Sequence, residues 1–278
     1  MKSSKPVIFT DLDGTLLFKK DYSFEPARPT LERIKNEGIP LVFASSKTRA
    51  EIIEIRKKLN NNHPFISENG GAIYIPKGYF PFDVEGEDTP DYKVITFGRP
   101  YDEIRKALVE TREGMGGNII GFGDLTEEDI NKMTGMDLAD AKLAKEREFD
   151  EPIFFRGSME LEREFFIRIE EKGLSWTRGR FYHILGKHDK GMAVKVLKDY
   201  YRKLYGDISV IGAGDGANDL PFLRESDYPV IVKRDDGRYE QLYLDGLIKA
   251  DGIGPEGWNK AIAGILDSLS ASKTATTR

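Results

Sequence analysis

The stretch VIFTDLDGTLL, from Val7 to Leu17, decides how the chain begins to fold. Its apolar residues predict a buried strand over Lys5–Thr10, which ends where Asp11 opens a polar turn. Two carboxylates two positions apart at the end of a buried strand are costly, because like charges repel and burial disfavours ionised groups. We therefore expect a positive charge to compensate Asp11 and Asp13 in the folded protein.

The composition fits a globular protein and narrows the possible classes. The 278 residues are enough for one large domain or two smaller ones, with 39% apolar and 32% charged residues. A net charge of −5 argues against a nucleic-acid partner. The absence of cysteine excludes disulfides, thiolate metal sites and cysteine nucleophiles. No signal peptide or membrane-spanning stretch is recognisable, so we expect a cytoplasmic protein with no membrane partner.

Apolar segments and amphipathic helices alternate over the first and last parts of the chain, which predicts an α/β fold with a Rossmann-like parallel-sheet core. The sequence PFISENGGAIYIP adds a hairpin about Asn69-Gly70. The expected strands are Lys5–Thr10, Pro40–Ser45, Asp207–Ile211 and Tyr228–Val232; the expected helices are Pro29–Glu37, Arg49–Leu59, Asp189–Leu204 and Glu256–Leu269, followed by a disordered tail from Ser268.

The middle of the chain has a different pattern. The acidic stretch Asp83–Asp91, which carries Gly and Pro, predicts a hinge, and a second hinge is expected at Gly186–Lys187. Between them, strands and helices predict an α+β unit of about 100 residues, a plausible size for a domain. The expected division is a core of residues 1–85 and 187–278 with an inserted cap domain of residues 86–186.

Four polar clusters lie at the ends of predicted core strands or open the helices between them. They are Asp11/Asp13, Ser45 to Arg49, Asp189-Lys190 and Asp215 to Asp219. Ligands gather at the carboxyl ends of the strands in an open α/β sheet, so we expect these clusters to meet in space. Carboxylates from Asp11 and Asp215 would then share one Mg²⁺, which prefers oxygen ligands and would offset their repulsion.

Such a site would divide the work of phosphoryl transfer among its residues. Asp11, kept ionised by the metal, would attack phosphorus as a nucleophile and form an aspartyl-phosphate. Asp13 would protonate the leaving oxygen and later activate the water that cleaves the intermediate. Lys190 and Ser45 would hold the phosphoryl oxygens, with the Ser46 hydroxyl as the alternative to Ser45.

Two further stretches are candidates for contacts with the substrate. Lys47 and Arg49 are cations at the start of a predicted helix, where they oppose the macrodipole, so an anionic ligand is expected beside them. The run Glu68, Asn69, Gly70 and Gly71 has two interpretations. It is either only the turn of a hairpin, or a loop whose amides and Asn69 side chain contact substrate between core and cap.

Together these motifs resemble the haloacid dehalogenase superfamily of phosphatases. DLDGT, the Ser after the second strand, the DKG before a helix, and GDGANDLP follow the order and spacing of its four motifs. The inserted domain resembles the cap of its Cof-like (type IIB) subfamily. The resemblance implies Asp11, Asp13, Ser45 and Lys190 as catalytic residues, and a Mg²⁺ site drawn from Asp11, Asp13, Asp215 and Asp219.

Longer stretches resemble the phosphatases within this superfamily that act on mannosyl-3-phosphoglycerate. They are SSKTR, ENGG, GFGDLT, AKEREFDEP, GRFYHILGKHDKG and GPEGW. This resemblance implies hydrolysis of a phosphorylated glycosyl-glycerate to a compatible solute, mannosylglycerate. It also implies substrate contacts from Ser46, Lys47, Arg49, Glu68, Asn69, Gly70, Gly71, Arg147, Arg180, His183 and Asn218.

The alternatives belong to three classes. A phosphatase for the glucosyl analogue or another sugar phosphate differs little in sequence, because axial and equatorial hydroxyls change only one or two hydrogen bonds. A phosphomutase would return the phosphoryl group to the substrate instead of to water. A sugar-phosphate-binding module would lack turnover, and the full set of four motifs argues against it. The sequence leaves the oligomeric state open.

Overall fold

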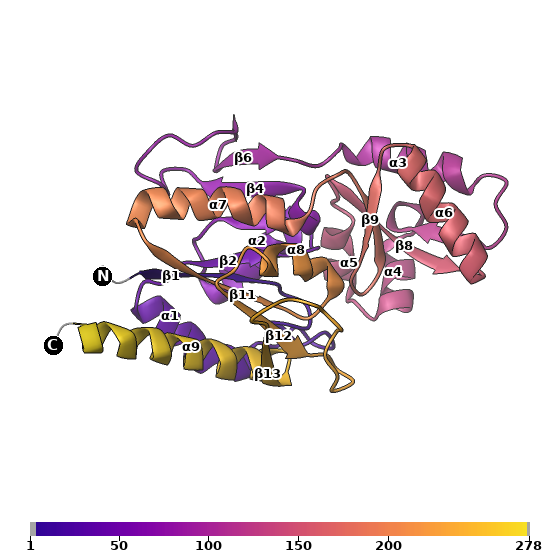
Figure 1. Cartoon of the computed structure of the whole chain (residues 1–278). Coiled ribbons are helices and arrows are strands. Elements are labelled where there is room, and N and C mark those ends of the chain that lie inside the picture. The colour runs from indigo at the N-terminus through magenta and orange to yellow at the C-terminus, as the bar shows by residue number, and fades with distance from the viewer. Residues whose placement is uncertain (1–3, 277–278) are drawn as a thin grey trace.

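The computed structural model describes residues 4–276 and contains a nine-stranded and a four-stranded sheet (Figure 1). We call the part built on the nine strands, residues 4–97 and 187–276, the large-sheet unit. Residues 98–186 form the small-sheet unit, which lies beside one end of the large sheet in Figure 1. Within the described residues, no helix is long and apolar enough to cross a membrane.

The large sheet has a parallel centre, as predicted. Its order is β13-β12-β11-β1-β2-β3-β4-β6-β5, in which β13 through β3 run parallel and the pairs from β3 to β5 run antiparallel. The strands are β1 (Lys5–Thr10), β2 (Leu41–Ala44), β3 (Phe65–Ser67), β4 (Ala72–Pro76), β5 (Glu87–Asp88), β6 (Tyr92–Thr96), β11 (Ile208–Gly214), β12 (Tyr228–Lys233) and β13 (Ile248–Ile253).

Helices cover both faces of this sheet, which is why its central strands are apolar throughout. Along β1, Ile8 packs toward α1 (Arg28–Asn36), α2 (Arg49–Leu59) and α9 (Pro255–Thr276), whereas Val7 and Phe9 pack toward α7 (Lys190–Tyr205) and α8 (Leu220–Leu223). Trp258 of α9 is fully buried and donates its indole N–H to Thr10 Oγ1 at 3.0 Å. This contact fixes the end of β1, directly before Asp11.

The small sheet is antiparallel, in the order β7-β8-β10-β9, and also carries helices on both faces. Ile104, Leu108, Phe165 and Ile169 form one core with the sheet, and Phe122, Phe154 and Phe181 belong to the other. The elements are α3 (Tyr101–Arg112), β7 (Asn118–Gly121), α4 (Glu127–Thr134), α5 (Leu138–Ala144), β8 (Asp150–Arg156), α6 (Met159–Glu171), β9 (Ser175–Arg178) and β10 (Tyr182–Leu185), with short 3₁₀ turns at Glu25–Ala27, Glu68–Gly70, Phe122–Asp124 and Ala217–Asp219.

Three boundaries differ from the sequence prediction. Strands β5 and β6 pair with the large sheet through β4, so residues 87–96 lie with the core strands and not with the region 86–186 that was assigned to the cap. The sequence pattern of the middle region also predicts a helix over Asp137–Glu148, but this helix ends at Ala144. Helix α9 continues to Thr276, so the tail expected to be disordered from Ser268 is helical, and residues 277–278 lie outside the described part.

Candidate active site

A buried lysine compensates the carboxylate at the end of β1. Asp11 is only 5% exposed, and its Oδ1 accepts a hydrogen bond from Lys190 Nζ at 2.7 Å. Lys190 is the first residue of α7 and is fully buried, and its Nζ also donates to Asp219 Oδ1 at 2.6 Å. The ammonium group therefore lies between two acids that are 208 positions apart in the sequence, as the convergence of strand ends predicted.

Three buried carboxylates form a potential metal site. Oxygen atoms of Asp11, Asp215 and Asp219 lie within 4.8 Å of one another. The second Asp219 oxygen, Oδ2, accepts the backbone N–H groups of Asp215 at 2.9 Å and Gly216 at 3.0 Å, which fixes its orientation. Asp215 Oδ2 is paired with Lys19 Nζ at 2.6 Å. Buried carboxylate oxygens from two strand ends are the ligands that a hard divalent cation prefers.

The pKa shifts of these residues indicate that the nearby lysines do not fully offset the negative charge of the three buried carboxylates. Burial raises the pKa of Asp11, and the neighbouring Lys190 only partly opposes this. Burial also raises the pKa of Asp215 to about 7, against the lowering effect of Lys19. For Lys190, burial by itself lowers the pKa, but the charges of Asp11 and Asp219 outweigh it and raise the pKa. A divalent cation would restore the ionised carboxylates, so the residues present fit such an ion.

Asp13 lies outside the three-carboxylate group that would hold the metal. Its Oδ2 is paired with Lys47 Nζ at 3.1 Å, and Lys47 is also paired with Glu51 at 3.0 Å. The other Asp13 oxygen, Oδ1, is buried and has no hydrogen-bond partner among residues 4–276. Burial raises the pKa of Asp13 despite the charge of Lys47. An acid with a raised pKa and an oxygen to spare is suited to proton transfer, whereas the sequence had also placed its carboxylate among the metal ligands.

Gly14 allows this group to assemble. Its φ of 82° is a conformation that residues with a side chain rarely adopt. A Cβ at this position would lie 2.4 Å from Lys19 Cε and 2.6 Å from Asp215 Oδ2. The glycine of the DLDGT motif therefore lets Lys19 approach Asp215.

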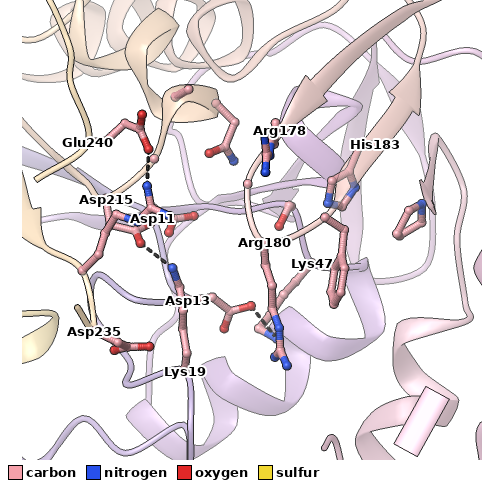
Figure 2. A pocket seen from close by; sticks show the side chains of 18 of the residues that line it. Asp11, Asp13, Lys19, Lys47, Arg178, Arg180, His183, Asp215, Asp235 and Glu240 are labelled. Carbon is pink, nitrogen blue, oxygen red and sulfur yellow. Dashed lines mark hydrogen bonds and ion pairs between the residues drawn. The ribbon is translucent and has the colours of Figure 1, made fainter. Parts of the chain in front are cut away.

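The acids form one end of a cavity of about 590 Å³ between the two units (Figure 2). That volume is in the range of small-molecule sites. In Figure 2 the acids Asp11 and Asp215 lie on one side, and Arg178 and His183 of the small-sheet unit lie across from them. Basic side chains contributed by both units line the wall: Lys19, Lys47, Arg147, Arg178, Arg180, His183 and Arg234.

The residues of the predicted cluster from Ser45 to Arg49 do not all face the cavity. Ser45 is fully buried and its Oγ accepts the Lys47 backbone N–H at 3.2 Å, whereas Ser46 lines the cavity. Arg49 does not face the cavity. Its Nε donates to Glu148 Oε1 of the small-sheet unit at 2.8 Å, so a carboxylate of the chain supplies the anion that the sequence expected from a ligand.

The Glu68–Gly71 loop joins the two units. β3 and β4 form the predicted hairpin, but the buried Glu68 carboxylate accepts backbone N–H groups of residues 148, 149 and 150 at 2.8–3.1 Å. A Cβ on Gly70 would lie 2.1 Å from Asp189 O, and one on Gly71 would lie 2.5 Å from Phe149 Cβ. Burial, followed by the charge of Asp150, raises the pKa of Glu68 to about 8.

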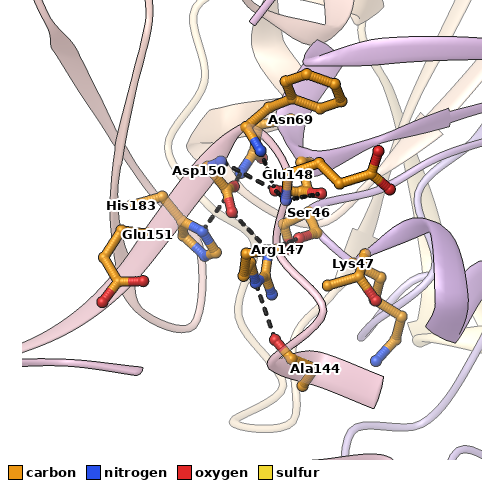
Figure 3. Close-up of polar contacts among 12 residues, drawn as sticks. Ser46, Lys47, Asn69, Ala144, Arg147, Glu148, Asp150, Glu151 and His183 are labelled. Atoms are coloured by element: carbon orange, nitrogen blue, oxygen red, sulfur yellow. Dashed lines mark hydrogen bonds and ion pairs between the residues drawn. The ribbon is translucent and has the colours of Figure 1, made fainter. Parts of the chain in front are cut away.

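The predicted residues of the small-sheet unit all lie along the cavity. Arg147 and His183 are buried in its wall and both contact Asp150 (Figure 3). Arg180 lines the cavity and donates to the Thr134 carbonyl. Asn218 of the large-sheet unit lines the cavity as well, and its Nδ2 donates to Asn69 Oδ1 at 3.1 Å.

A sequence profile described as haloacid dehalogenase-like hydrolase matches residues 8–238, which include every one of the four polar clusters. The chain belongs to this hydrolase family. The hydrolase is 44% identical over 265 residues to a glucosyl-3-phosphoglycerate/mannosyl-3-phosphoglycerate phosphatase of Methanococcoides burtonii, covering 94% of this chain and 97% of that protein. It is 43% identical over 231 residues to a mannosyl-3-phosphoglycerate phosphatase of Pyrococcus horikoshii, covering 81% of this chain and 90% of that protein.

Solved structures share the fold of this hydrolase at lower identity. A subclass IIB sugar phosphatase of the same superfamily superposes with a TM-score of 0.62 at 15% identity, covering 96% of this chain and 99% of its own. The sucrose-phosphatase of Synechocystis, solved with sucrose and phosphate, gives 0.61 at 14% identity with the same coverage. These matches confirm the predicted fold class.

Sequence reasoning did not identify several residues of the site in this hydrolase. Lys19 carries no local signal, because its partner Asp215 lies far away in the sequence, and Asp150 carries none because its partners Asn69 and His183 also lie far away. Arg178 had a local signal, since the sequence also predicts a hairpin about Arg178-Gly179, and two arginines flank its glycine. Arg234 and Asp235 follow the predicted strand Tyr228–Val232, so the rule that found the four polar clusters could have found them too.

Proposed function

We propose that this hydrolase is a phosphatase for glycosyl-3-phosphoglycerates, which it cleaves to the free glycosyl-glycerate and inorganic phosphate. The observation that carries the proposal is the arrangement of the cavity. A nucleophile-bearing acidic cluster lies at one end, and basic side chains of the other unit line the wall where an anionic glyceryl group would lie. The relatives named for this activity match nearly the whole chain at 43–44% identity.

We infer that Asp11 attacks phosphorus and becomes an aspartyl-phosphate while the glyceryl oxygen departs. Asp13 gives its proton to that oxygen, then removes a proton from the water that attacks the intermediate, which releases phosphate and restores Asp11. Lys190 neutralises oxygens of the transferring group. Asp11, Asp215 and Asp219 would hold Mg²⁺, which when bound supplies positive charge to the phosphoryl oxygens.

The small-sheet unit is, in this proposal, a cap domain that selects the substrate. Its hinges would lie where the chain leaves β6 and where it returns before α7. Closing over the cavity would exclude bulk water and place His183, Arg147 and Arg180 against the sugar and glycerate. With a mannosyl substrate the product is mannosylglycerate, so we assign the enzyme to the cytoplasmic synthesis of that solute.

The glucosyl substrate is the second candidate, because the relative from Methanococcoides burtonii is named for both sugars. The test is phosphate release with Mg²⁺ from mannosyl-3-phosphoglycerate, glucosyl-3-phosphoglycerate, sucrose 6-phosphate and mannose 6-phosphate. We expect kcat/KM for the first two to exceed the others by at least about 100-fold, since the free sugar phosphates lack the glycerate carboxylate.

Two results would refute the proposal. One is equal rates on all four esters. The other is isomerisation of a sugar phosphate without phosphate release, which would identify a phosphomutase. The Asp11→Asn variant and a chelator-treated sample serve as controls, and both should release no phosphate above background.

A further inference from the structure

We propose that Asp150 is a positioning residue for substrate recognition. It holds His183 and Arg147 in place along the cavity wall and connects them, through Asn69, to the turn that carries Asp219. The inference rests on the proposed function, because it assigns these two basic groups to the part of the substrate that is not phosphate.

Three side chains donate hydrogen bonds to the Asp150 carboxylate (Figure 3). It is the first residue of β8 and is fully buried. Its Oδ2 accepts from His183 Nδ1 at 3.0 Å and from Asn69 Nδ2 at 2.9 Å, and its Oδ1 accepts from Arg147 Nη1 at 2.5 Å. One carboxylate thus receives three donors, one from the large-sheet unit and two from the small-sheet unit.

These contacts fix the orientation of both basic side chains and the position of the proton on His183. A carboxylate is only an acceptor, so His183 must carry its proton on Nδ1, which leaves Nε2 for another partner. The Arg147 guanidinium is fixed further by Ser46 O at 2.8 Å and by Ala144 O at 3.0 Å. Both side chains line the cavity, so their orientation is set before a ligand arrives.

The same carboxylate connects the cavity wall to the acidic cluster. Asn69, which donates to Asp150, accepts at its Oδ1 from Asn218 Nδ2 at 3.1 Å. Asn218 precedes Asp219, whose carboxylate is paired with Lys190 at 2.6 Å. Asp219 is also held by Lys190 and by the backbone N–H groups of Asp215 and Gly216, so the loss of Asp150 should act mainly on the cavity wall and much less on the phosphoryl end.

The charge of Asp150 suits this role. Burial by itself raises its pKa, but Arg147 and then His183 outweigh burial and lower the pKa below the ordinary range for an aspartate. The carboxylate therefore stays ionised around neutral pH and can hold two basic partners. An amide of the same shape cannot accept from all three donors with the same strength.

The test compares Asp150→Asn with wild type on two substrates, mannosyl-3-phosphoglycerate and p-nitrophenyl phosphate. We expect kcat/KM for the glycosyl substrate to fall about 100-fold, because a misplaced positioning group of this kind costs that order of rate. The small aryl ester does not reach the wall, so its kcat/KM should change less than about threefold. The diagnostic value is the ratio of the two losses, which a general loss of folded protein would leave at one.

Glu151→Gln is the matched control. Glu151 is the next residue of β8, is equally buried, and points to the other side of the strand, where it accepts from Tyr101, Arg105 and the Gly123 backbone. Its loss should lower the melting temperature while leaving the ratio of the two activities near that of wild type.

Asn69→Gly is a second variant that keeps the test decisive if Asp150→Asn does not fold. Asn69 has a φ of 57°, which glycine adopts without strain, so the substitution removes only the side chain between Asn218 and Asp150. It should lower kcat/KM for mannosyl-3-phosphoglycerate more than kcat/KM for p-nitrophenyl phosphate, as Asp150→Asn does. Equal losses on both substrates in Asp150→Asn and in Asn69→Gly would overturn this inference alone, whereas wild type that cleaves only p-nitrophenyl phosphate would overturn the proposed function as well.

Discussion

Replacing Lys190 by methionine removes an ammonium group that contacts both Asp11 and Asp219. Methionine has a similar length and an apolar end, so it fills the same buried space. The two carboxylates, which lie 2.7 and 2.6 Å from Lys190 Nζ in the wild-type protein, lose their shared partner. Both the stability of the metal-free protein and the rate of phosphoryl transfer should therefore fall.

The magnitude follows from the burial of all three groups. Removing one partner of a buried ion pair typically costs about 3–5 kcal/mol, because the remaining charge is left uncompensated. For a protein of this size, about 4 kcal/mol lowers the melting temperature by roughly 10 °C. The loss of a group that neutralises the transferring phosphoryl oxygens should lower kcat by about 10²–10³.

Thermal unfolding in EDTA and in excess Mg²⁺ separates these effects. A divalent cation binds the same carboxylates and supplies the missing charge, so the variant should gain more melting temperature from Mg²⁺ than wild type gains. Arg202→Met is the control on the same helix. Arg202 is paired with Asp199 at the surface at 3.3 Å, and its loss should cost at most about 1 kcal/mol in either buffer.

A melting temperature within about 2 °C of wild type in EDTA would contradict the idea that Lys190 compensates the buried acids. Equal gains from Mg²⁺ in the variant and in wild type would contradict the shared location of the lysine and the cation.

The site leads to four other predictions. Asp11→Asn should abolish phosphate release with little change in melting temperature, because Lys190 keeps Asp219 as its partner and burial already disfavours the ionised form of Asp11. Asp13→Asn should lower kcat by about 10²–10⁴; near-normal turnover in either variant would refute its assigned role. Because burial raises the pKa of Asp215 to about 7, protons compete with the cation for this carboxylate. The Mg²⁺ concentration that gives half-maximal activity should therefore decrease as the pH is raised from 6 to 8. A constant value would exclude this competition. Burial raises the pKa of Glu68 from 4.5 to about 8 in the folded protein, so wild type should lose stability relative to Glu68→Gln as the pH rises from 4.5 to 8. Chemical denaturation at several pH values measures this difference. If the free energies of unfolding of the two proteins change in parallel with pH, the raised pKa is refuted.

Local patterns predicted most elements of the large-sheet unit. The strand Lys5–Thr10 and the helix Arg49–Leu59 were predicted with the bounds they have, because an apolar run and an amphipathic stripe are properties of the segment itself. The meeting of Asp11, Lys190 and Asp219 followed from one topological rule for parallel strands.

The remaining features depend on partners that a single segment does not reveal. The alternating residues from Tyr92 to Phe97 predict a strand, but the sheet that this strand joins is set by its pairing with β4. The helix after Asp137 ends at Ala144, and beyond it Arg147 reaches Ser46 O and Asp150, contacts that no periodicity encodes. Arg49 was expected to meet a ligand, and only the fold reveals that Glu148, 99 positions away, supplies its anion.

The hydrogen bond between Trp258 and Thr10 has a consequence for synthesis of the protein. β1 emerges from the ribosome early, yet its neighbour β11 and the indole that supports its end are encoded some 200 to 250 residues later. The loop that carries Asp11 therefore lacks both of these supports on a partly translated chain. We expect newly made protein to acquire activity only after translation has passed Trp258.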